Sequence, residues 1–151
     1  MTDDERAMMM LEKSIYEAQA MLEKDQIFRP FAMLLDKNGE IERIDNSIAN
    51  ARDSYRALYK EVKLYIEQKE VDIIVLLADT KMPESISDGS VDSAIRVHLE
   101  ERSQQYRKIA GRYIYVPYQL QRSVGREQIH AKLFLPKAVS FPSEFLSYSG
   151  R

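Results

Sequence analysis

Six side chains in the second half of the chain have the types and spacing from which a binding site is built. Period-two alternation along residues 94–100, 113–118 and 129–135 is typical of strands, whose successive side chains point to opposite faces. The six that fall on the polar sides of these strands are Arg96, His98, Glu100, Tyr113, Tyr115 and His130. An imidazole titrates near neutral pH and can act as a base, and a guanidinium can hold an anion. We therefore expect any ligand-binding or partner-binding site to lie on this face.

The two histidines decide which chemistry such a face could perform. If the three strands are consecutive neighbours, His98 and His130 flank a tyrosine strand at about 9–10 Å, because adjacent strands lie about 4.8 Å apart. That separation is too long for direct contact and suits a ligand held between the rings. A pair of histidines on separate strands is a weak signal for a metal site. We expect no metal and no cofactor, and we assign no catalytic residue.

Composition excludes several common kinds of site. The chain has 151 residues, no Cys and five Gly. Without Cys there is no disulfide, no thiolate zinc site and no cysteine nucleophile. The dispersed glycines form neither a dinucleotide-binding fingerprint nor a P-loop. The segment 36–39, Asp-Lys-Asn-Gly, lacks the later Gly and Glu of a calcium loop and predicts a tight turn.

Two stretches have the apolar spacing of amphipathic helices. The first begins at the capping box Thr2-Asp3-Asp4-Glu5 and ends before Pro30. The second runs from about Ser47 to Gln68. Positions three and four apart share one helical face, and the predicted apolar stripes are Met8, Leu11, Ile15, Ala18 and Leu22 in the first helix and Ile48, Ala51, Tyr55, Leu58, Val62 and Ile66 in the second.

The remaining segments predict strands. Residues 31–44 form a hairpin around the turn at 36–39, and residues 71–78 are apolar almost throughout, as in a strand covered on both faces or along most of one. With the three alternating strands, the order is α-β-β-α-β-β-β-β. We predict an α+β fold: a two-layer sandwich with a mostly antiparallel sheet and both helices on one face. Residues 1–136 form a single domain, and residues 137–151 a loosely packed C-terminal tail.

Three segments resemble a family of small, uncharacterised bacterial α+β proteins. They are Pro30-Phe31-Ala32 with Leu35-Asp36 and Gly39-Glu40-Ile41, then Ala94-Ile95-Arg96-Val97 with Leu99-Glu100 and Arg102, and then Tyr115-Val116-Pro117-Tyr118. The resemblance covers residues 28–135 and consists mostly of strand and turn motifs. It implies an architecture and no activity.

Charge is unevenly distributed along the chain. Residues 1–75 contain 16 acidic and 11 basic residues, whereas residues 102–132 contain seven basic residues and one acidic residue, interleaved with tyrosines. A basic sheet with exposed aromatic rings can stack single-stranded RNA. The sequence pI of about 5.8 is below the value expected of a nucleic-acid-binding domain. RNA binding through residues 102–132 is therefore kept as a further alternative.

The function that we expect is a non-catalytic binding or interaction module. The acidic N-terminus does not predict a secretory signal, and no apolar run approaches the roughly 20 residues of a membrane span, so we expect a cytoplasmic protein without a membrane partner. Its partner would be a second copy, in a homodimer, or another protein. The main alternative is a small-ligand sensor or an enzyme that uses the face of Arg96, His98, Tyr115 and His130.

Overall fold

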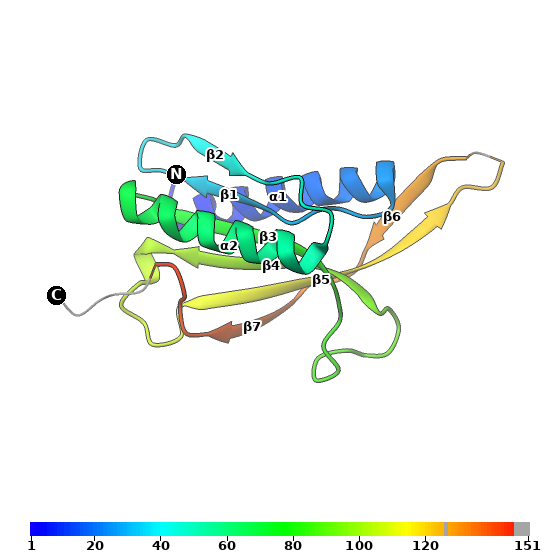
Figure 1. The fold of residues 1–151 in the computed structure, drawn as a ribbon. Helices are drawn as coiled ribbons and strands as arrows, with labels where there is room; N and C mark the ends of the chain where they lie inside the picture. The colour runs from blue at the N-terminus through cyan, green and yellow to red at the C-terminus, as the bar shows by residue number, and fades with distance from the viewer. Residues whose placement is uncertain (126, 147–151) are drawn as a thin grey trace.

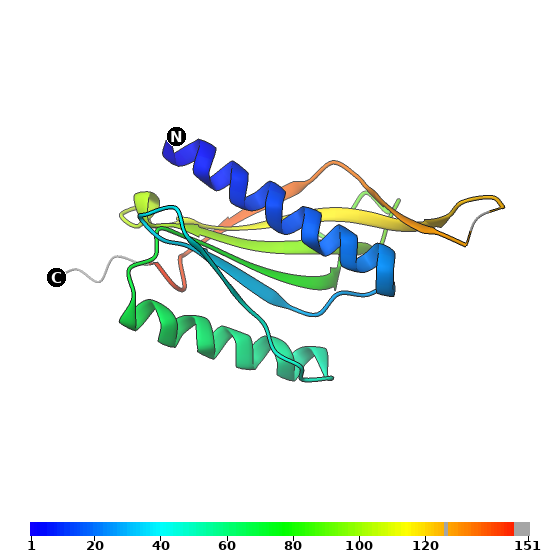
Figure 2. The same ribbon diagram turned by 90° about the horizontal axis from the view of Figure 1, so that it is seen from above.

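Seven strands form a curled sheet with one helix on each side in the computed structural model, which describes residues 1–125 and 127–146 (Figures 1 and 2). The elements are α1 (Asp3–Asp25), β1 (Phe31–Leu35), β2 (Ile41–Ile44), α2 (Ala51–Gln68), β3 (Ile73–Lys81), β4 (Ser93–Glu101), the short 3₁₀ helix η1 (Arg102–Gln104), β5 (Gly111–Arg122), β6 (Ile129–Leu133) and β7 (Lys137–Phe141). The predicted α+β class and element order are confirmed as far as β6, and β7 follows as a further strand.

The sheet is antiparallel at every pairing, in the order β2-β1-β3-β4-β5-β6. The long strand β5 has two partners on one side. Residues 111–115 pair with β7, and residues 118–122 pair with β6. The β5–β6 hairpin consequently extends beyond the rest of the sheet, as Figure 1 shows.

The two helices cover opposite faces of the sheet, so the prediction that both lie on one face is wrong (Figure 2). Met33 and Val75 belong to the core under α1, whereas Leu34 and Ile74, the next residues along the same strands, belong to the core under α2. β1 and most of β3 are buried at successive positions. A strand that is apolar on both faces needs a cover on each, and the second helix supplies it.

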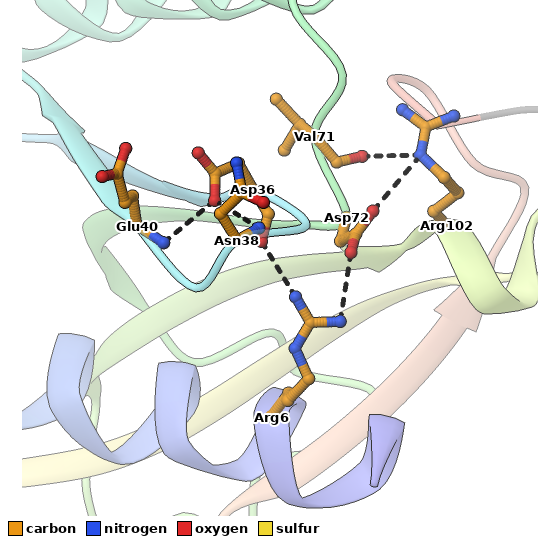
Figure 3. A network of polar contacts seen from close by, with 7 residues as sticks. All are labelled: Arg6, Asp36, Asn38, Glu40, Val71, Asp72 and Arg102. Atoms are coloured by element: carbon orange, nitrogen blue, oxygen red, sulfur yellow. Dashed lines mark hydrogen bonds and ion pairs between the residues drawn. The ribbon is translucent and has the colours of Figure 1, made fainter. Parts of the chain in front are cut away.

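Arg6 fastens the N-terminal part of α1 to two loops at the same end of the sheet (Figure 3). Its guanidinium donates to the carboxylate of Asp72 at 3.1 Å and to the carbonyl of Asp36 at 2.9 Å. On the other side of Asp72, Arg102 donates to the carbonyl of Val71 at 2.8 Å and lies 3.7 Å from the Asp72 carboxylate. These contacts set the position of α1 relative to the start of β3.

The segment predicted to be a loosely packed tail is part of the fold in residues 137–146. β7 pairs with β5 over five residues, and Phe145 and Leu146 are buried in the core under α2. Residues 147–151 of the predicted tail lie outside the described residues. The strand was not predicted from the sequence because β7 has only five residues and is mostly exposed, which gives little hydrophobic periodicity.

Neither helix of the described chain has the length and apolar character required to cross a bilayer.

Candidate functional site

Five of the six predicted site residues share one face of the sheet, the face that α2 partly covers. Arg96, His98 and Glu100 alternate along β4 with residues of the opposite core, and the register places Arg96 opposite Tyr115 and His98 opposite Tyr113. The alternation of side chains along the strands therefore places these five residues on one face, as expected. The five residues differ in accessibility. Arg96 and Tyr113 are half-buried, whereas Tyr115, His98 and Glu100 are buried.

His130 does not belong to this group. β6 pairs with the outer half of β5, where His130 lies opposite Gln121, and the place beside Tyr113 is taken by Val139 of β7. The ring of His130 is instead 2.8 Å from the carboxylate of Glu23 at the end of α1. The prediction that the two histidines flank one tyrosine strand is wrong, because it assumed that β6 runs beside the whole of β5.

Aromatic rings pack around His98, which is 0% exposed. The rings of Tyr113, Phe141 and Phe145 have centroids 5.0–5.1 Å from that of His98. Two of these rings come from the segment that was predicted to be a tail. The available signal was the pair of phenylalanines after Pro136, since aromatic residues are the side chains that gain most from burial.

A buried carboxylate fixes the other side of the His98 ring. Nε2 of His98 lies 2.5 Å from Oε2 of Glu100, and both side chains are fully enclosed. Glu100 also accepts the backbone N–H groups of Glu144, Phe145 and Leu146, each at 2.9 Å. Burial alone would raise the pKa of Glu100, but the hydrogen bonds from His98 and the backbone outweigh it and hold the pKa below its ordinary value. Glu100 is therefore an ionised carboxylate inside the protein.

Nδ1 of His98 faces a second carboxylate without touching it. It lies 3.7 Å from Oε2 of Glu144, beyond hydrogen-bond distance, and it is buried without a hydrogen-bond partner. The side chain of Glu144 is 39% exposed, so this carboxylate connects the buried ring to the surface. Sequence reasoning missed Glu144, because one acidic residue in an irregular segment carries no pattern.

Tyr59 of α2 closes the site beside Glu144. Its ring packs on Phe145 with centroids 4.7 Å apart. Burial and then the neighbouring Glu144 carboxylate raise the pKa of Tyr59 to about 12, so its phenol stays protonated at physiological pH.

Arg96 lies at the accessible edge of the same face, between two tyrosine rings. Its guanidinium carbon is 5.1 Å from the ring centroid of Tyr55 in α2 and 4.8 Å from that of Tyr113 in β5. Its Nε is buried without a hydrogen-bond partner, and none of the ion pairs among residues 1–125 and 127–146 includes Arg96. Arg96 is thus a half-buried cation that forms no ion pair with the described residues.

Neither Arg96 nor His98 lines any of five surface clefts identified over the described parts of the chain. The largest, of about 610 Å³, lies between the end of α1 and the β5–β6 hairpin and includes His130 and Glu23 in its wall. The face of β4 and β5 therefore presents a partly exposed surface at Arg96 and a closed interior at His98.

Comparison with known proteins gives no match to a family model, a curated protein or a solved structure.

Proposed function

We propose that the protein is a non-catalytic binding module that recognises an acidic group of a partner protein through the Arg96 patch, defined as Arg96, Tyr55 and Tyr113. The observation that carries this proposal is the half-buried guanidinium between two tyrosine rings, with no ion pair in the described chain. A charge withdrawn from water without a partner is unfavourable. An incoming carboxylate would remove that disadvantage.

The chemistry of the patch suits a carboxylate. A guanidinium is planar and presents its N–H groups in a fork that matches the two oxygens of a carboxylate. The rings of Tyr55 and Tyr113 lie within cation–π distance and limit the motion of the Arg96 side chain. A cation that is already oriented loses less conformational freedom when a partner binds.

A catalytic role for the same face has less support. A general base must come within hydrogen-bond reach of a substrate proton, but His98 is fully buried and its Nε2 is held by Glu100. The second histidine of the sequence hypothesis lies on the projecting hairpin with Glu23. The imidazole on the face of Arg96 is buried, and the two histidines of the sensor or enzyme alternative lie apart.

RNA binding through residues 102–132 has less support, because Arg102 and Arg112 lie far from Arg122. Near one end of β5, Arg102 donates to the carbonyl of Val71 and lies close to the Asp72 carboxylate. Arg112 forms an ion pair with Glu101. Arg122 lies at the other end of this 12-residue strand, about 30 Å away at the usual rise per residue. Arg102 and Arg112 are therefore separated in space from Arg122.

Benzoate tests the proposal, because it combines a carboxylate with a ring that can pack on tyrosine. Two-dimensional ¹H–¹⁵N NMR spectra of the full chain would be recorded during titration with benzoate and with neutral benzamide. We expect benzoate alone to shift the signals of Tyr55, Arg96 and Tyr113, and Arg96→Gln to abolish the shifts. Arg56→Gln, an exposed substitution one residue after Tyr55, is the matched control and should leave them unchanged. Equal responses to benzamide, or persistence of the shifts in Arg96→Gln, would refute carboxylate recognition.

Homodimerisation and cytoplasmic location stay predictions from the sequence. Sedimentation of the full chain at tens of micromolar tests the first, and fractionation of cells tests the second. A monomer at that concentration would leave another protein, rather than a second copy, as the proposed partner.

A further inference from the structure

His98, Glu100 and Glu144 bring one imidazole and two carboxylates together from β4 and the segment after β7. One donor atom from each of these residues lies within 4.8 Å of the others. We propose that this cluster, the His98–Glu144 site, binds one divalent transition-metal ion, zinc by its chemistry, through Nδ1 of His98 and the carboxylate of Glu144. In this arrangement Glu100 holds the opposite side of the imidazole. Tyr113 borders both this site and the Arg96 patch, but it supplies no ligand to the ion.

The unpartnered nitrogen of His98 is the first observation that points to a ligand. Nδ1 belongs to a side chain that is 0% exposed, and it has no hydrogen-bond partner. A buried polar atom without a partner is unfavourable and rare in folded proteins. Its direction is informative as well, because the nearest carboxylate oxygen on that side is Oε2 of Glu144.

Glu100 prepares the imidazole for metal binding. An ionised carboxylate only accepts hydrogen bonds, so its contact with Nε2 places a proton on that nitrogen. In the neutral imidazole, Nδ1 then carries the lone pair. Metal-binding histidines in proteins almost always donate their other ring N–H to a carboxylate, a carbonyl or water, which fixes the tautomer and the ring orientation. The three backbone N–H groups bonded to Glu100 keep that carboxylate in place.

The distance between the donor atoms fits a bridging ion better than a hydrogen bond. Nδ1 and Oε2 of Glu144 are 3.7 Å apart. Zinc binds nitrogen and carboxylate oxygen at about 2.0–2.2 Å, so two of its ligands lie between about 3.3 Å, at the tetrahedral angle, and about 4 Å apart. A direct N–H···O bond would require a separation of about 3 Å.

Charge and access also favour a cation here. Glu100 and Glu144 are carboxylates on either side of one ring, and the side chain of Glu144 is 39% exposed, so the cluster extends to the surface. The mixture of imidazole and carboxylate donors favours zinc over calcium or magnesium, which prefer all-oxygen sites.

Titration of the metal-free full chain with Zn²⁺ by calorimetry tests this inference. We expect one ion per chain, and Glu144→Gln to weaken binding about tenfold or more, since even residues that only orient a metal ligand contribute about 10–100-fold. Glu144→Gln changes a partly exposed side chain and leaves the backbone bond to Glu100 in place. His98→Asn should abolish binding, with folding checked by circular dichroism. Cobalt in place of zinc gives a visible spectrum that should change in the Glu144→Gln variant.

The surface pair of His130 and Glu23 supplies the matched controls. It also joins an imidazole and a carboxylate, at 2.8 Å, but on an exposed hairpin. His130→Asn and Glu23→Gln should leave zinc binding unchanged. No zinc binding, or binding that survives Glu144→Gln and disappears in His130→Asn, would overturn the assignment.

Discussion

Glu100 accepts the backbone N–H of Phe145 at 2.9 Å, across 45 positions of sequence. The same carboxylate accepts the N–H groups of Glu144 and Leu146. An inner strand thus holds the segment after β7 through its main chain, independently of the side chains of that segment. The cover over His98 therefore depends on this carboxylate as well as on the pairing of β7 with β5.

Replacing Glu100 by Gln should loosen this cover. A carboxamide offers one acceptor oxygen where the carboxylate offers two, so buried N–H groups lose partners at about 1–3 kcal/mol each. We expect the free energy of unfolding to fall by about 2–3 kcal/mol in urea denaturation. Amide hydrogen exchange of residues 144–146, followed by mass spectrometry, should become faster. Glu42→Gln, on the exposed strand β2, is the control and should change neither quantity. Unchanged exchange at 144–146 in Glu100→Gln would contradict the role given to Glu100.

Leu22 and Leu58 test the placement of the helices on opposite faces. Each is fully buried, Leu22 of α1 in one core and Leu58 of α2 in the other. Leu→Ala substitutions in cores cost about 2–5 kcal/mol. The two side chains share no core. The double variant should therefore lose a free energy of unfolding equal to the sum of the two single-variant losses, to within about 0.5 kcal/mol. Denaturant unfolding measures all three variants, and a large coupling energy would indicate that the helices share one face.

Asp79 and Tyr118 predict a pH-dependent contribution to stability. The Tyr118 hydroxyl donates to Asp79 at 2.7 Å, and burial raises the pKa of Asp79 although this hydrogen bond opposes the rise. A carboxyl whose pKa is higher in the folded state than in the unfolded state stabilises the fold at low pH and loses that contribution as the pH rises through the folded value. The side chain of Asp79→Asn cannot ionise. The free energy of unfolding of this variant, relative to that of the unaltered chain, should therefore be higher at pH 7 than at pH 3. Denaturant unfolding of both chains at pH 3 and pH 7 measures this difference, and a variant that is relatively less stable at pH 7 would contradict the prediction.

Tyr118→Phe tests the hydrogen bond itself. Without the hydroxyl, the Asp79 carboxylate loses a donor, so its pKa should rise further, as followed by ¹³C NMR of the carboxyl group. An Asp79 pKa that falls or stays constant in this variant would show that the bond does not stabilise the ionised form.

The two contacts of Arg6 are predicted to require the forked geometry of a guanidinium. Arg6 bonds to Asp72 and to the carbonyl of Asp36 at the same time, and the single ammonium of Lys cannot reproduce both contacts of the fork. Arg6→Lys should lower the free energy of unfolding by about 1–2 kcal/mol and speed amide exchange in the first turns of α1. The exposed Arg52→Lys is the matched control. Equal effects of the two substitutions would argue against the network in Figure 3.

The features that the sequence predicts well are those with a local physical cause. The capping of α1 by Thr2 and the turn at Asp36, whose side chain accepts two backbone N–H groups, depend on residues within four positions of each other. The shared face of Arg96 and His98 follows from strand alternation. Each of these needs no knowledge of distant contacts.

The features that the sequence does not determine depend on which distant segments meet. The stripe of α2 shows which side of the helix is buried, but not which sheet face it covers. The change of partner along β5 had one cue, Pro117, which lies between Tyr115, the last residue paired with β7, and Tyr118, the first paired with β6. Proline cannot donate to a ladder and therefore favours such a gap. Glu144 reaches His98 only because β7 returns beside β5, and no local pattern indicates that return.

The position of β7 in the chain has a consequence for folding during synthesis. The β5–β6 hairpin leaves the ribosome before residues 137–146, so the growing chain first carries His98 and Glu100 on a face without its aromatic cover. Chains that stop before residue 137 would lack the rings of Phe141 and Phe145 that pack on His98 and the three backbone N–H groups that Glu100 accepts. Incomplete chains therefore expose a surface around His98 that β7 and the segment after it cover in the complete fold.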